Sequence, residues 1–211
     1  MPKSYSLKAG RARVLRRVTS LLSLTLILSL SPHSAHSNDL RIWDTLQGTT
    51  PKGYVLLLRH SYAPGVGDPA NFKLDDCSTQ RNLSQEGRDD AREIGEWLKR
   101  REIKIARVES SRWCRAKETA ELLDIGRVKL NRNLDSLFQE SDLINHPQTL
   151  KVRKQIRDYR NKTGLLVLVG HFVNIAALTG VGVDSGEGVL VRADGKGVIK
   201  VVGRTPSLNR G

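Results

Sequence analysis

Two apolar runs of similar design stand out along the chain, and each is followed by a histidine. The first covers residues 54–58 and continues into Arg59 and His60, and the second covers residues 165–169 and precedes His171. Short runs of leucine and β-branched residues bounded by turn residues are typical of interior parallel strands. Ligands collect beyond the carboxyl ends of such strands. One such histidine alone would favour a structural role, but the matched pair predicts chemistry, centred on His60.

Helical and extended patterns alternate through the rest of the chain. Ser84 is the expected N-cap of an amphipathic helix that continues to about Arg101. The expected elements after it are a strand at 103–108, a helix at 112–123, a strand at 128–130, helices at 149–159 and 175–178, and a hairpin of strands at 186–192 and 197–202. Strands alternating with helices predict an α/β fold.

The first 37 residues have the layout of a secretory signal. Six lysines and arginines without an acid precede an apolar stretch at residues 21–30, and Ala35-His36-Ser37 offers a small-x-small cleavage site. The apolar stretch is short for a membrane span, so we expect export with cleavage, and retention as an uncleaved anchor is the lesser alternative. Arg16-Arg17 also suggests twin-arginine export, but the residues after it favour general secretion.

The remaining chain is expected to form one domain of ordinary size, periplasmic or secreted. We place an N-terminal extension at residues 38–52, the domain at residues 53–203 and a polar tail at residues 204–211. Within the extension, Trp43 and Leu46 predict one short helix. No internal repeat or linker divides this part of the chain.

Charge and aromatic content limit the class of ligand. The formal charge of +13 falls to +7 without the signal segment. The remaining basic residues are dispersed and few aromatic residues accompany them, which argues against nucleic-acid binding. A moderate positive charge suits an acidic or phosphorylated ligand.

Export changes the interpretation of the two cysteines. Cys77 and Cys114 would enter a compartment in which disulfides persist, and an even count permits one bridge. We expect a disulfide between the loop after the first strand and the second long helix. Two buried free thiols are the alternative.

An anion site is expected where the second strand meets the next helix. Ser110 and Ser111 would place hydroxyl groups beside the free N–H groups of the helix start. Arg115, one turn into the helix, would point back at the same anion. The alternative for Arg115 is a place on a solvated face.

Three ordered motifs together resemble the histidine phosphatase superfamily, the branch that also contains the phosphoglycerate mutases. They are Arg59-His60, the stretch from Ser110 to Arg115, and Gly170-His171, and the resemblance covers residues 53 to about 192. It implies a three-layer α/β/α sandwich with a mostly parallel central sheet, like that of the phosphoglycerate mutases. It also implies a pocket that needs no metal and no cofactor.

The resemblance assigns roles to the residues of the pocket. His60 would be the nucleophile and carry a phosphohistidine, a recognised form of covalent catalysis. Its ring must be neutral at the attacking nitrogen, with the proton of the other nitrogen held by a backbone acceptor. Arg59 and Arg115 would bind phosphate oxygens as planar forks. His171 would donate a further hydrogen bond to the transferred group.

The sequence departs from the family pattern in several places. Ser61 follows the nucleophile where the family usually has glycine, which weakens the mutase interpretation. The stretch from Arg81 to Ser84 resembles the small phosphohistidine phosphatases and makes Arg81 a candidate phosphate ligand, with a solvated loop arginine as the equal alternative.

The proton donor is not assigned by the motifs. Ser136 occupies the position of the usual glutamate, and the candidates to replace it are Asp135, Glu140, Asp142 and Glu187, of which Glu187 is weakly favoured. Without a donor the enzyme would prefer substrates with good leaving groups, since general acid catalysis contributes about 10²–10⁴-fold.

These observations predict an exported phosphatase acting on a small phosphorylated substrate or a phosphoprotein. A non-catalytic phosphate sensor is the first alternative, and a mutase-like phosphotransferase is the second. Substrate specificity is expected to lie in the loops at residues 65–81 and 135–146.

Overall fold

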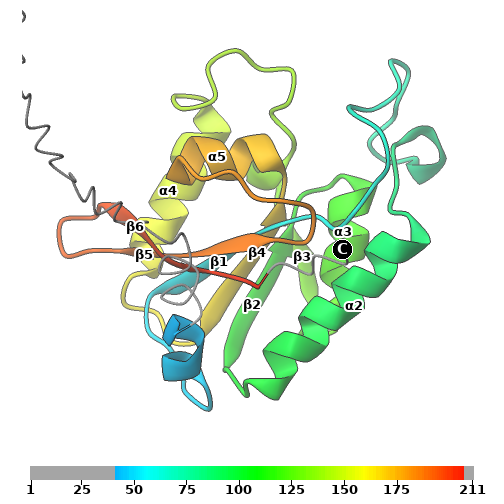
Figure 1. The fold of residues 1–211 in the computed structure, drawn as a ribbon. Coiled ribbons are helices and arrows are strands. Elements are labelled where there is room, and N and C mark those ends of the chain that lie inside the picture. The colour runs from blue at the N-terminus through cyan, green and yellow to red at the C-terminus, as the bar shows by residue number, and fades with distance from the viewer. Residues whose placement is uncertain (1–40, 207–211) are drawn as a thin grey trace, which may run out of the picture. The chain divides into compact units, whose positions relative to one another are not determined.

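A computed structural model describes residues 41–206, which centre on one six-stranded sheet (Figure 1). The strand order is β3-β2-β4-β1-β5-β6. The strands are β1 (Tyr54–Arg59), β2 (Ile105–Ser110), β3 (Val128–Leu130), β4 (Leu165–Gly170), β5 (Gly188–Ala193) and β6 (Ile199–Arg204). The helices are α2 (Gln85–Arg100), α3 (Cys114–Leu122), α4 (Pro147–Tyr159) and α5 (Phe172–Thr179), with short 3-10 turns η1 (Cys77–Thr79) and η2 (Arg132–Leu134).

The sheet is mostly parallel, as predicted. Strands β1, β4, β2 and β3 pair in parallel, whereas β5 is antiparallel to both β1 and β6. The expected hairpin is therefore confirmed as β5 and β6. Strand β2 begins two residues later than the pattern at 103–108 indicated, because its pairing with β4 starts at Ile105.

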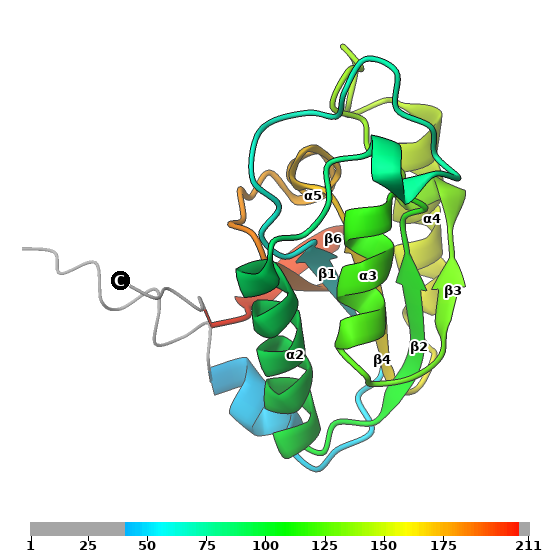
Figure 2. The same ribbon diagram turned by 90° about the vertical axis from the view of Figure 1, so that its right-hand side faces the viewer.

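The side chains of β1 alternate between two hydrophobic layers, as a buried strand requires. Leu56 and Leu58 pack into a cluster with residues of α2 and α3, whereas Val55 and Leu57 pack into a second cluster with residues of α4 and α5. Figure 2 shows α2 and α3 on one face of the sheet, with α4 beyond it. The predicted α/β/α sandwich is confirmed.

Residues 41–46 are helical, and Ile42, Trp43 and Leu46 pack in the first of these clusters. Trp43 is fully buried, its ring lies 4.9 Å from that of Trp97, and its Nε1 donates a 2.6 Å hydrogen bond to the carbonyl of Arg204. The short helix predicted around Trp43 and Leu46 is thus present and contributes to the core.

Ser84 caps α2, since its side chain accepts a hydrogen bond from the Gly87 N–H.

The expected signal segment, residues 1–37, lies outside the described residues, as do the last five residues of the expected tail. Within residues 41–206, no helix has the length and apolar character needed to cross a membrane.

Candidate active site

The two predicted histidines meet at the carboxyl edge of the sheet. His60 follows β1 and His171 follows β4, and these neighbouring parallel strands are in register through Arg59 and Gly170. The backbone N–H of His60 donates to the Gly170 carbonyl, and the two imidazole rings lie 5.4 Å apart. Each histidine is only 3% exposed.

The surroundings of His60 hold its ring in the neutral form with one defined tautomer. Nδ1 lies 2.8 Å from the carbonyl oxygen of Ser61, which can only accept, so Nδ1 carries the proton. Burial lowers the pKa of His60 to about 3, and the charges of Arg115 and Arg59 act in the same direction. The unprotonated Nε2 accepts a 3.3 Å hydrogen bond from Nε of Arg115. This is the state expected of a nucleophile.

Three arginines surround the histidines. Arg115 is buried, and its NH1 forms a 2.8 Å ion pair with Asp68. Arg59 donates to the Val183 carbonyl at 2.9 Å. These two, together with Arg81, His60 and His171, line a cavity of about 420 Å³. The structure therefore gathers Arg59, His60, Arg115 and His171 in one pocket.

Arg81 lies in this cavity but is already engaged by the loop that carries it. Its Nε donates to the carbonyl of Gly67 at 2.7 Å, and its NH1 donates to the carbonyl of Ala63. The side chain therefore holds the loop in shape as well as adding positive charge to the pocket.

Ser111 occupies a different place from the one expected for a phosphate ligand. It is fully buried, and its hydroxyl lies 2.9 Å from Nε2 of His171, so it fixes the ring of that histidine. Helix α3 begins only at Cys114, and the side-chain oxygen of Gln80 accepts from the Cys114 N–H at 3.0 Å. The start of the helix is thus partly occupied by a protein group.

Asp68 is a pocket residue that sequence reasoning missed. Its carboxylate accepts hydrogen bonds from Arg115, from the backbone of Arg81 at 3.0 Å and from Nε1 of Trp113 at 3.1 Å. Burial acts to raise the pKa of Asp68, but the hydrogen bonds from Arg115 and Arg81 outweigh it and lower the pKa. The only signal in the sequence was its position in the long loop at residues 65–81.

The candidate proton donors differ from one another in burial and in whether they line the cavity. Glu140 is exposed and lines the cavity, and no salt bridge holds it among the described residues. The carboxylate of Glu187 is buried, pairs with Arg204 at 3.0 Å and is not part of the cavity wall that the structure describes. Asp135 lines the cavity but is held by Arg112 at 2.5 Å. Access to the cavity therefore favours Glu140 over Glu187 as the proton donor.

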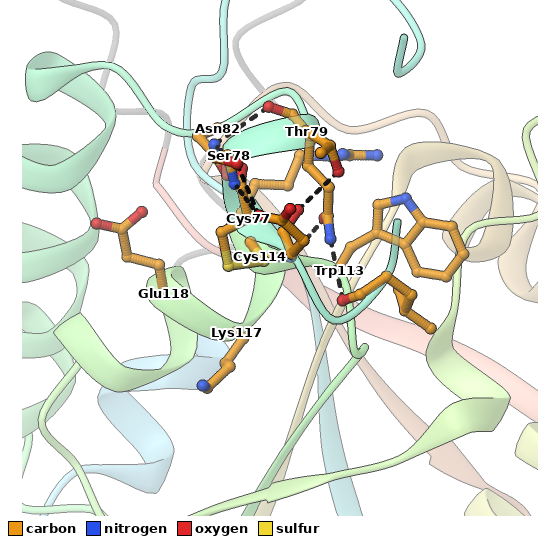
Figure 3. Close-up of a disulfide and its surroundings, with 12 residues drawn as sticks. Cys77, Ser78, Thr79, Asn82, Trp113, Cys114, Lys117 and Glu118 are labelled. Carbon is orange, nitrogen blue, oxygen red and sulfur yellow. Dashed lines mark hydrogen bonds between the residues drawn. A yellow bond between two sulfur atoms is a disulfide. The ribbon is translucent and has the colours of Figure 1, made fainter. Parts of the chain in front are cut away.

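The expected disulfide between Cys77 and Cys114 is confirmed (Figure 3). The two Cα atoms are 5.7 Å apart, and the bridge joins η1 to the first residue of α3. Asn82 supports the same turn by donating to the Cys77 carbonyl at 2.6 Å. The disulfide thus ties the pocket loop to the helix that carries Arg115.

Across residues 41–206 there is no group of three or more His, Cys, Asp or Glu side chains that could hold a metal ion.

Comparison with solved structures shows the same fold at low sequence identity. The protein histidine phosphatase SixA in complex with tungstate has a TM-score of 0.55 and 20% identity, over 72% of this chain and 96% of that chain. A proposed alpha-ribazole-5'-P phosphatase from Escherichia coli has a TM-score of 0.55 and 15% identity, over 76% and 100%. Phosphoserine phosphatase from Entamoeba histolytica, in complex with 3-phosphoglyceric acid, has a TM-score of 0.54 and 13% identity, over 74% and 98%.

Comparison with curated protein sequences found no match. Residues 55–165, more than half of the chain, match the family described as the histidine phosphatase superfamily (branch 1). This range contains Arg59, His60 and Arg115, and His171 follows it by six residues. The chain therefore belongs to the histidine phosphatase superfamily, branch 1.

Proposed function

We propose that this protein is an exported phosphatase that hydrolyses a phosphate ester or a phosphoprotein through a phosphohistidine on His60. The observation that carries the proposal is the state of that ring. Its Nδ1 proton is held by the Ser61 carbonyl, its unprotonated Nε2 accepts a hydrogen bond from Arg115, and the ring lines a cavity together with Arg59, Arg81 and Arg115. Family membership and the fold support the same activity.

In the first step, the Nε2 lone pair of His60 attacks phosphorus, and the bond from phosphorus to the leaving oxygen breaks. Charge on the transferred group is spread over three equatorial oxygens, which require fixed donors. Arg59, Arg115 and His171 supply them. When phosphate binds, the Nε–H of Arg115 exchanges its hydrogen bond to Nε2 of His60 for one to a phosphate oxygen, and the proton stays on Arg115.

In the second step, water attacks phosphorus, the bond from phosphorus to Nε2 breaks, and inorganic phosphate leaves. Because Nδ1 keeps its proton, the phosphorylated ring of His60 is cationic and departs as neutral imidazole. The Ser61 carbonyl stabilises that cation at 2.8 Å. The same hydrogen bond therefore serves both attack and release.

Glu140 is our candidate for the group that protonates the leaving oxygen. It lies on the cavity wall, in the loop where the family usually has its acid, four residues after Ser136. A positioned acid contributes about 10²–10⁴-fold when the leaving group is a poor one.

Export rests on the sequence of residues 1–37, and the disulfide between Cys77 and Cys114 supports it. Cysteine pairs of this kind persist in oxidising compartments. Mass spectrometry of the protein from the periplasm tests this part, and we expect a chain that begins near Asn38 with both cysteines oxidised. A full-length, reduced, cytoplasmic protein would contradict it.

The activity is tested by hydrolysis of a chromogenic aryl phosphate. We expect turnover by the wild-type protein and none by His60→Ala. Thermal unfolding of both proteins checks that the variant is folded. Absence of turnover in the wild type, combined with micromolar binding of inorganic phosphate, would instead indicate a phosphate sensor.

A further inference from the structure

All three phenylalanines of the chain line the active-site cavity, and none lies in the hydrophobic core of the described residues. Phe138 is 56% exposed and Phe172 is 44% exposed, whereas Phe72 is half-buried. Trp113 lines the same cavity. Single exposed apolar residues are common, but a group of large ones around one pocket indicates a binding surface.

These four side chains, which we call the aromatic rim, come from four separate segments. Phe72 lies in the loop after β1, Trp113 precedes α3, Phe138 follows η2, and Phe172 begins α5. Figure 3 shows Trp113 beside the disulfide-bonded turn. The fold brings them together although no sequence motif links them.

The aromatic rim lies next to two residues of the proposed phosphate site, Arg59 and His171. The ring of Trp113 lies 5.7 Å from Phe72 and 5.8 Å from His171. The guanidinium of Arg59 lies 5.5 Å from the centre of the Phe172 ring. A phosphate seated between Arg59 and His171 would therefore carry its substituent onto aromatic surface.

Polar and charged groups, including Arg112 and Glu140, line the same cavity as the aromatic rim. Ser136, Gln139 and Gln148 line the same cavity and offer hydroxyl and amide groups. Ligand pockets commonly combine apolar walls with a few polar groups that fix orientation. The wall thus suits a substituent that has an apolar face and a polar edge.

We propose that the substrate is a ring-bearing phosphomonoester, whose ring packs on Phe72, Trp113, Phe138 and Phe172 while its phosphate binds the arginines. The proposal rests on the proposed phosphatase function and specifies its substrate class. Small open-chain phosphates, such as a phosphorylated serine or glycerol, would leave the rim uncovered and are expected to be poor substrates.

Binding of phosphonates to the wild-type protein tests this without interference from leaving-group chemistry, because the carbon–phosphorus bond is not hydrolysed. Calorimetry would compare inorganic phosphate, methylphosphonate, benzylphosphonate and cyclohexylmethylphosphonate. We expect both ring compounds to bind at least about tenfold more tightly than methylphosphonate, since a ring face is removed from water. The tighter of the two identifies a planar or a saturated ring.

The outcomes separate the two proposals. Binding of phosphate and methylphosphonate with no gain from either ring would overturn the ring-bearing substrate and leave the phosphatase intact. Failure of every anion to bind would overturn both.

A matched pair of variants tests whether the rim provides the added affinity for ring-bearing phosphonates. Phe138→Ala should reduce the preference for benzylphosphonate over methylphosphonate by several-fold and leave methylphosphonate binding unchanged. Ile144→Ala is the control, because Ile144 lies in the same loop with the same 56% exposure but does not line the cavity. Both side chains are exposed, so both variants should fold. An equal effect of the two substitutions, or none from Phe138→Ala, would contradict the proposed rim.

Discussion

Asp68 and Arg115 form a 2.8 Å ion pair inside the pocket, with side chains only 9% and 3% exposed. The pair directs the guanidinium so that NH1 faces the carboxylate while Nε faces His60. Asp68 is therefore a positioning residue. Its carboxylate also offsets one positive charge in a pocket that four arginines line.

Replacement of Asp68 by Asn should separate binding from turnover. We expect kcat to fall, by up to about 10², because a misplaced guanidinium no longer fits the transferred group. The affinity for inorganic phosphate should stay equal or rise, since a negative charge has been removed. Steady-state kinetics with phosphate inhibition measures both, and Asp89→Asn on the surface of α2 is the control. Weaker phosphate binding together with lower kcat would indicate a general structural role.

The two buried histidines should make the fold sensitive to acid. Burial lowers the pKa of His60 to about 3 and lowers that of His171 well below its usual value. The unfolded chain then binds more protons than the folded chain, so stability is lost as the pH falls through about 6.5.

Between pH 7 and pH 5 we expect the free energy of unfolding to fall by about 2 kcal/mol because of His60, and His171 acts in the same direction. Urea unfolding at the two pH values measures the change. His60→Ala should reduce this pH dependence by about 2 kcal/mol, and comparison within each protein cancels the cost of the substitution itself. An unchanged pH dependence in the variant would contradict the buried neutral state of His60.

The disulfide should stabilise the protein substantially. Cys77 and Cys114 are 37 residues apart, and closing a loop of that length is worth about 4 kcal/mol in the chain-entropy account. We expect the double variant Cys77→Ser and Cys114→Ser to unfold at lower urea concentration and to lose activity before global unfolding, because its pocket loop is no longer tied to α3. A reductant should destabilise the wild type and leave the double variant unchanged. Equal responses of the two proteins would argue against the disulfide.

The position of the general acid can be tested with two glutamates. Glu140→Gln should slow hydrolysis of alkyl phosphates by about 10²–10⁴-fold and barely affect an aryl phosphate, whose leaving group departs without help. Glu187→Gln is the matched control, since its carboxylate pairs with Arg204 away from the cavity. Equal losses on both substrates would indicate that Glu140 positions the substrate. A loss confined to Glu187→Gln would reverse the assignment.

Much of the fold was predictable because strand ends have a strong local signal. The apolar runs before His60 and His171 indicated buried strands, and the structure confirms β1 and β4 as neighbours. Arg115 was found through its spacing from Ser110. These features depend on short-range patterns that can be recognised in a single sequence.

The missed features depend on contacts between segments distant in the chain. Asp68 lies in a loop without periodicity, and its role arises from Arg115, which is 47 residues away. The sequence pattern predicts Ser111 at a helix start, but α3 begins three residues later and the hydroxyl faces His171. The aromatic rim cannot be predicted from the sequence for the same reason, since its members come from four separate segments.

The most direct test of the account is detection of the covalent intermediate. Rapid-quench experiments with a ³²P-labelled aryl phosphate, followed by peptide mapping, would locate the label. We predict acid-labile, base-stable phosphate on His60 that forms and decays at rates consistent with turnover, and its absence from a folded His60→Ala variant. Full activity of the wild type without any labelled His60, or activity retained by His60→Ala, would contradict the mechanism.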